Sequence, residues 1–154
     1  MQGIRIIEIP DCKMVSSGIG VFGEERFDVF FNWFTALPKT IFPKDFLFWD
    51  GDSGGFHWLY LYDEGMNTPA GYEIIDFKGG LYAIATDIDQ QTDMDALDAE
   101  RDVFLKANGF QVDESRPRMG NIITSPRASG ILGYHQMDYY TPVESIQAHF
   151  SEWQ

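Results

Sequence analysis

The stretch GYHQMDYY, residues 133–140, sets a carboxylate among aromatic side chains, because Asp138 lies between Met137 and Tyr139. An ionised carboxylate in an apolar environment is costly unless it serves a purpose, and attracting a cationic ligand is one such purpose. The stretch GFHWLYLY, residues 55–62, has the same form, and aligning the two stretches matches Tyr60 with Asp138. The other aligned pairs are Gly55 with Gly133, Phe56 with Tyr134, His57 with His135 and Tyr62 with Tyr140.

Side chains alternate along a strand, so each of these stretches predicts two faces. We expect the odd-numbered residues to pack against helices, and these are Leu59, Leu61, Met137 and Tyr139. The even-numbered residues combine rings with hydroxyls, an amide and a carboxylate, and these are Trp58, Tyr60, Tyr62, Gln136, Asp138 and Tyr140. Apolar walls with a few polar groups are typical of small-molecule sites. The even-numbered residues are therefore the predicted ligand-binding set, with an ordinary core or an oligomer interface as the alternative.

Both stretches close a longer pattern that occurs twice in the chain. Segment 5–18 matches segment 73–86, with IIE (6–8) over IID (74–76). Each is followed by a helical segment: 25–37 has phenylalanines at helical spacing, and 92–109 has a Thr92-x-x-Asp95 cap and an Asn108-Gly109 stop. The third segment of the first copy is DFLFWD (45–50), and GNIITS (120–125) matches it more loosely in the second copy. The turn-rich connections GDSGG and PRASGILG then lead to the last strands.

This pattern predicts an α+β fold built from two strand–helix–strand–strand units. Since one unit cannot cover both faces of its sheet, we expect two of them, related by a pseudo-two-fold axis, to form one domain with a cleft. Repeat one spans about 3–65, repeat two about 71–143 and the domain 1–144, with a tail at 145–154.

Composition narrows the class of protein. Of the residues, 44% are hydrophobic and 16% aromatic, which excludes a disordered chain. The net charge of −13 argues against nucleic acid as a partner, because phosphate binding needs lysine and arginine. The acidic surface aids solubility and attracts cations. No apolar run is long enough for a membrane span, and no signal peptide is evident. With Cys12 as its single cysteine, the protein is expected in the cytoplasm.

Three further motifs carry weak signals. GIGVFG (18–23) fits a nucleotide-binding glycine pattern, but the matching place in repeat two has no glycine, so a strand-to-helix turn is favoured. His57 and His135 occupy matching places without further ligands nearby, which favours hydrogen-bonded structural histidines over a metal site. Arg116 and Arg118 either hold a loop or neutralise an acid. No metal and no cofactor are therefore expected.

The tandem plan, the strand FKGGLYAIATD (77–87) and the terminal MDYYTPVE (137–144) resemble the GyrI-like small-molecule-binding domains. These domains also serve as effector-binding domains of AraC- and MerR-type regulators. The resemblance covers roughly residues 3–144, and Asp138, four residues before Pro142, takes the place of the family's acid. The chain begins directly at the first strand and so resembles a stand-alone member.

The resemblance implies a binding protein for planar, hydrophobic, often cationic aromatic compounds, active in protection against drugs or toxins. Some stand-alone members are similar to hydrolases that open the cyclopropane ring of DNA-alkylating natural products, which is the first alternative. In that reaction Asp138 is expected to act as the base towards water, and Tyr60 or Tyr140 to donate to the developing negative charge. Glu64 is the next candidate for the base. A gyrase-inhibitor-like module that docks on a protein is the second alternative.

Overall fold

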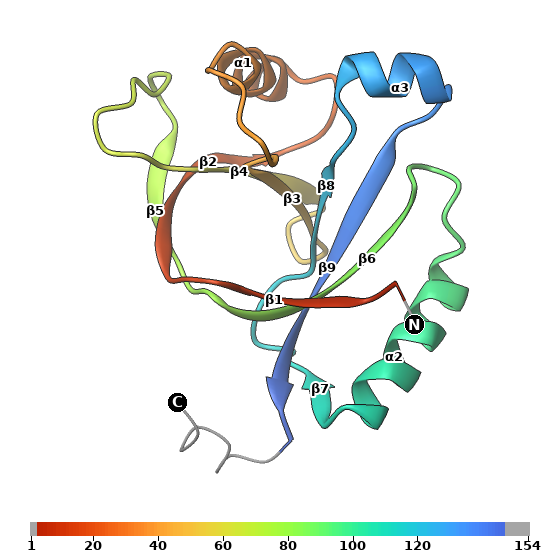
Figure 1. Ribbon diagram of the computed structural model, residues 1–154. Helices are drawn as coiled ribbons and strands as arrows, with labels where there is room; N and C mark the ends of the chain where they lie inside the picture. The colour runs from red at the N-terminus through yellow and green to blue at the C-terminus, as the bar shows by residue number, and fades with distance from the viewer. Residues whose placement is uncertain (1–2, 147–154) are drawn as a thin grey trace. The chain divides into compact units, whose positions relative to one another are not determined.

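The computed structural model describes residues 3–146, which form nine β-strands and three α-helices (Figure 1). The strand pairs are antiparallel, and the predicted α+β class is confirmed. Contacts between residues divide the chain into two compact units. Of the described residues, unit 1 comprises 3–9, Gly80–Arg118 and 122–146, and unit 2 comprises Pro10–Gly79 and Met119–Asn121. No helix of this part of the chain is long and apolar enough to cross a membrane.

Unit 2 is a sheet with one helix on one of its faces. Its strands are β2 (Cys12–Gly20), β3 (Asp45–Asp50), β4 (Gly55–Leu61), β5 (Glu73–Phe77) and, within the unit, Met119–Asn121 of β8 (Met119–Ile122). They lie in the order β8-β3-β4-β2-β5. Helix α1 (Glu25–Thr35) packs on β2 and β4 (Figure 1). Two members of the phenylalanine stripe predicted from the sequence form its contact face, since Phe27 is 1% and Phe30 0% exposed, whereas Phe31 of the same stripe is 46% exposed.

The face of β4 that α1 covers is the opposite of the predicted one. Tyr60 packs with Val15 and Phe30 in a single apolar cluster, so the even-numbered side chains of β4 meet the helix. Leu59, expected against the helix, is buried on the other face of the strand, where it lies opposite Phe46 of β3. Alternation shows which residues share a face. It does not show which face the helix takes when both are apolar, as they are here.

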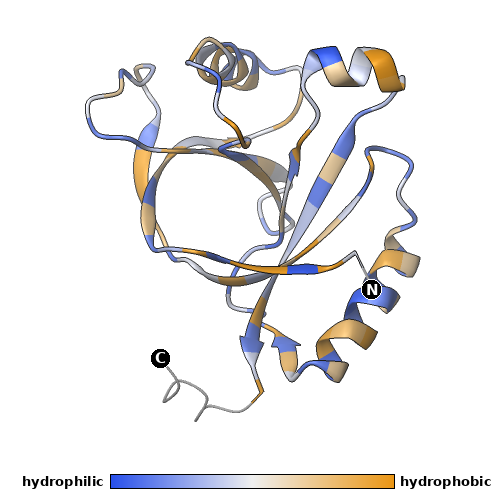
Figure 2. Cartoon of the chain, in the orientation of Figure 1, coloured by the Kyte–Doolittle hydropathy of each residue, from blue (hydrophilic) through white to orange (hydrophobic). Residues whose placement is uncertain are grey.

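Unit 1 is built from antiparallel strands with helix α2 packed on them. Its elements are β1 (Arg5–Ile9), β6 (Gly80–Ile88), α2 (Met94–Ala107), β7 (Phe110–Val112), α3 (Pro126–Leu132) and β9 (Gln136–Ser145). Strand β6 lies between β1 and β9, and β7 pairs with β9. Hydrophobic and hydrophilic residues alternate along α2 (Figure 2). Its Leu105 packs with Ala83 and Val143, so the odd-numbered face of β9 meets the helix, as predicted.

The two long first strands predicted from the sequence are each broken in two, and the pieces pair crosswise. Segment 5–18 forms β1 and most of β2, and segment 73–86 forms β5 and most of β6. Strand β1 pairs with β6 in unit 1, whereas β5 pairs with β2 in unit 2. Residues 10–11 link β1 to β2, and residues 78–79 link β5 to β6. A hydrogen bond joins the two links, because the Gly79 amide donates to Asp11 Oδ1 at 2.8 Å.

The helix ends show two further differences from the expectations. The side chain that caps α2 is Asp93, which accepts from the Ala96 amide, rather than Thr92. The Thr92 hydroxyl donates instead to the Ile88 carbonyl. The connection PRASGILG contains the short helix α3, which Ser125 caps at its start and Gly133 ends with φ 84°. A serine before proline and a glycine after the last turn are the usual signals of such a helix, so α3 could have been predicted.

Candidate functional site

Unit 2 carries a dense group of aromatic rings centred on Trp58. The centroids of five phenylalanine rings lie 5.2–6.0 Å from the Trp58 ring, and these are Phe22, Phe27, Phe30, Phe31 and Phe34. We call these six residues the Trp58 cluster. Phe22 and Phe31 are 59% and 46% exposed, so the cluster reaches the surface. Aromatic rings at these distances and tilts attract one another beyond the area that they bury, and they attract a flat ligand in the same way.

Two tyrosines of the predicted ligand-binding set adjoin the Trp58 cluster. The Tyr60 ring stacks on Phe34 at 5.5 Å and meets Trp33 edge-on at 5.5 Å. Tyr62 packs against the same apolar cluster. Burial, and after it the nearby charge of Asp45, raises the pKa of Tyr60, so its hydroxyl keeps its proton at neutral pH.

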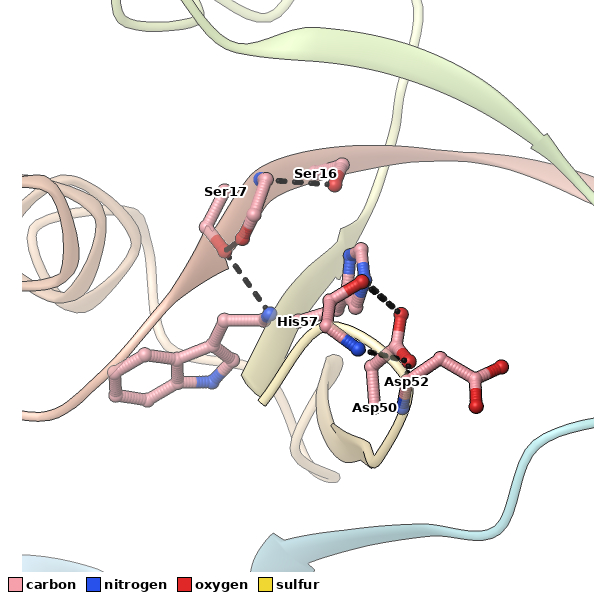
Figure 3. A network of polar contacts seen from close by, with 8 residues as sticks. Ser16, Ser17, Asp50, Asp52 and His57 are labelled. Atoms are coloured by element: carbon pink, nitrogen blue, oxygen red, sulfur yellow. Dashed lines mark hydrogen bonds and ion pairs between the residues drawn. The ribbon is translucent and has the colours of Figure 1, made fainter. Parts of the chain in front are cut away.

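An irregularity of β2 holds the main chain of Trp58. The register of β2 against β4 shifts between Ser16 and Ile19, opposite Trp58. The Ser17 hydroxyl replaces the missing ladder bond, since it accepts from the Trp58 amide at 3.0 Å and donates to the Gly18 carbonyl at 2.6 Å (Figure 3). Bulges often re-aim a side chain beside a functional site, and this bulge sets the position of Trp58.

A carboxylate that the sequence reasoning did not select lies beside the Trp58 cluster. The Trp58 indole Nε1–H donates to Asp45 Oδ2 at 3.0 Å, and the Asn121 side chain donates to the Asp45 carbonyl at 3.1 Å. Asp45 opens β3 and lies directly opposite Tyr60 of β4. Desolvation by burial raises the pKa of its carboxyl. The sequence signal was available in the hairpin register, because the turn GDSGG pairs Asp50 with Gly55 and therefore Asp45 with Tyr60.

The other predicted site residues lie on β9 in unit 1. Asp138 is 5% exposed, but it is not without a partner, contrary to the expectation of an uncompensated carboxylate. Arg5 donates to its Oδ2 at 2.9 Å, and Thr86 donates to its Oδ1 at 2.5 Å. The sequence could not show these partners, because they lie on β1 and β6.

Tyr140 and Gln136 share the even-numbered face of β9 with Asp138. Tyr140 is 8% exposed, and its ring meets that of Tyr82 at 6.3 Å. Gln136 is held through its main chain, which bonds the Thr124 hydroxyl and the Ile123 amide. The structure therefore brings Trp58, Tyr60 and Tyr62 together in unit 2, and Gln136, Asp138 and Tyr140 together in unit 1. Their roles stay predictions.

Other polar residues singled out in the sequence have structural partners. His57 contacts Asp50 at 3.3 Å (Figure 3) and stacks on Phe48, and His135 bonds the Thr124 hydroxyl. Arg116 holds a loop and also neutralises an acid: its Nε donates to Asp113, and its Nη2 donates to the carbonyls of Leu81 and Val143. Within residues 3–146, no three potential metal ligands of the His, Cys, Asp or Glu type come together.

Solved structures share this arrangement of elements over nearly the whole chain. A hydrolase from Listeria innocua superimposes with a TM-score of 0.65 at 13% identity, covering 92% of this chain and 91% of the hydrolase. The C-terminal domain of EcmrR gives 0.56 at 11% identity, with 92% and 97% covered. SAV2435, solved with bound tetraphenylphosphonium, gives 0.51 at 10% identity, with 97% and 98% covered.

The chain has the fold of these three proteins. The resemblance to the GyrI-like domains is thereby confirmed as a likeness of fold. No family profile matches the sequence, and no curated protein matches it either.

Proposed function

We propose that this protein binds flat, hydrophobic aromatic small molecules on the Trp58 cluster. The observation that carries the proposal is the geometry of the cluster, in which one indole is surrounded by five phenyl rings and two of these are exposed. An aromatic ligand gains stacking area there at little conformational cost, because aromatic side chains have few rotamers to lose. SAV2435, which shares the fold, holds a cation with four phenyl rings. Sequestering toxic aromatic compounds is the cellular role that would follow from such binding.

Titration with Nile red, a flat, neutral and fluorescent dye, tests the proposal. Trp58→Leu should weaken dye binding about three- to tenfold, because an aromatic pair contributes about 0.5–1.5 kcal/mol beyond the area buried. Trp49→Leu is the matched control, because Trp49 is 55% exposed in the same sheet and its ring meets that of Phe56 rather than the rings of the Trp58 cluster. Equal affinity in wild type and Trp58→Leu would move the site away from the cluster.

Hydrolysis is a second candidate, and two observations favour it. Asp138 and Tyr140 lie on one face of β9, which offers a carboxylate to a water and a phenol to a developing negative charge. The hydrolase from Listeria innocua shares the fold. Incubation with a cyclopropane fused to a conjugated ketone, followed by mass spectrometry, tests this candidate. Asp138→Asn should slow turnover by roughly 10²-fold. Return of the compound unaltered by wild type would refute hydrolysis and leave binding.

A further inference from the structure

Asp138 and Asp45 both lie beside aromatic rings, but they differ in what compensates their charge. Both oxygens of Asp138 are engaged by the chain itself, one by the Arg5 guanidinium and the other by the Thr86 hydroxyl. The Arg5–Asp138 ion pair leaves little net charge to attract a further cation. A ligand cation at Asp138 would have to compete with Arg5.

Asp45 has no such compensation. Its carboxylate accepts from neutral donors, the indole N–H of Trp58 and its own main-chain amide, and no Lys, Arg or His within residues 3–146 forms an ion pair with it. A partly desolvated carboxylate without a cation is unfavourable, and the same burial raises the pKa of Asp45. A bound cation would remove that cost.

The contact between Asp45 and Trp58 gives a cation two sources of attraction. The first is the direct Coulomb attraction to the carboxylate, which is stronger beside a low-dielectric cluster than in water. The second is the Trp58 ring face, since tryptophan binds cations best among the aromatic residues. Because the carboxylate accepts from the indole N–H, it polarises the ring and makes that face more negative. A flat cation on the Trp58 cluster profits from both effects, whereas its neutral counterpart profits from neither.

We propose that Asp45, rather than Asp138, makes this protein prefer cationic over neutral aromatic ligands. The assignment rests on the proposed binding function at the Trp58 cluster. It gives Asp138 and Arg5 a mutual structural partnership, and it places the selection of ligand charge in unit 2.

Nile blue and Nile red test the assignment, because they share one flat ring system but Nile blue is a cation at neutral pH. The dissociation constants of both dyes are measured for wild type, Asp45→Asn, Asp45→Ser and Asp138→Asn, with circular dichroism to verify folding. Wild type should prefer Nile blue. Both Asp45 variants should weaken Nile blue binding roughly tenfold, equivalent to about 1.4 kcal/mol, and should leave Nile red within about twofold. Asp138→Asn should leave the ratio of the two constants unchanged.

The outcomes separate the assignment from the function on which it rests. A ratio that falls in Asp138→Asn but stays constant in the Asp45 variants overturns the assignment and returns charge selection to β9. A ratio unchanged in all variants also overturns it while leaving aromatic binding intact. If neither dye binds wild type, the proposed function itself fails, and the assignment fails with it. If Asp45→Asn does not fold, the comparison is made with Asp45→Ser only.

Discussion

Replacing the carboxyl of Asp45 by the isosteric amide should stabilise the protein at neutral pH. Burial raises the pKa of this carboxyl, so the folded state holds its proton more tightly than the unfolded state does. The carboxyl ionises in the unfolded chain above a pKa of about 3.9, but in the folded chain it ionises only at a higher pH. Between these two pKa values and above them, ionisation therefore favours the unfolded state. The charged carboxylate is thus a cost to folding at pH 7. The amide of the Asp45→Asn variant would carry no charge and would still offer an oxygen to the Trp58 indole.

The size of the effect follows from the geometry. Asp45 keeps its hydrogen bond from Trp58 but forms no ion pair with any residue of the described range 3–146, so its cost lies at the low end of the roughly 1–3 kcal/mol found for poorly compensated buried polar groups. A gain of about 1 kcal/mol corresponds to a melting temperature about 2–4 °C higher for a protein of this size. The gain should shrink as the pH is lowered towards the folded pKa, because Asp45 then becomes neutral as well.

Urea unfolding of wild type and Asp45→Asn at several pH values between about 5 and 8 measures this difference. More acidic conditions approach the isoelectric point near 4.4, where a protein with little net charge tends to precipitate. Asp113→Asn is the matched control with the opposite sign. Hydrogen bonds from Ser115 and Arg116 lower the pKa of Asp113 to about 2, so its ionised form stabilises the fold above the unfolded pKa and that contribution is lost as pH falls towards 2. If Asp45→Asn is less stable than wild type at pH 7, the carboxylate is compensated and the reasoning fails.

Three further substitutions probe the supporting structure. Gly80→Ala should destabilise the protein by about 1–3 kcal/mol in urea unfolding. Gly80 has φ 145°, and a Cβ there would lie 2.7 Å from Cζ of Arg116. Hydrogen bonds hold the Arg116 guanidinium in place. A wild-type midpoint would show that Arg116 can move. Ser17→Ala should cost about 1–3 kcal/mol by leaving the Trp58 amide without its acceptor, and it should shift the tryptophan emission; an unchanged spectrum would count against the role of the bulge. Ser125→Ala should cost about 1 kcal/mol and speed amide exchange at the start of α3, whereas unchanged exchange would mean that the cap is dispensable.

The order of elements could be predicted because periodicity records it directly. The phenylalanine stripe indicated α1, DFLFWD matched β3 to the residue, and the alternating aromatic stretches indicated β4 and β9. The pairing of β1 with β6 and of β5 with β2 could not be predicted. RIIEI (5–9) and EIIDF (73–77) have the same pattern, so neither carries a local signal for one partner over the other.

The site was harder to predict than the fold. Trp58 and Tyr60 lie in one cluster on the same face of β4, but the helix-facing side of β4 was assigned wrongly because both of its faces are apolar. Asp138 interrupts an aromatic stretch, whereas Asp45 follows a lysine at the start of a strand. The two acids differ in their partners. The hairpin register of residues 45–60 shows that Asp45 lies opposite Tyr60, but no single stretch of sequence shows that Arg5 and Thr86 bind Asp138.

The pairing of β1 with β6 and of β2 with β5 also determines when these strands can pair during translation. Strand β1 is made first, but Arg5 can pair only after Ile84 has been synthesised. At about 5–20 residues per second, the apolar strand waits on the order of 5–15 seconds without its partner. During that interval β2 also lacks β5 and β3 lacks β8, so three strands of the nascent first repeat have an unfilled edge. Translation must therefore pass the middle of the second repeat before either unit can close its sheet.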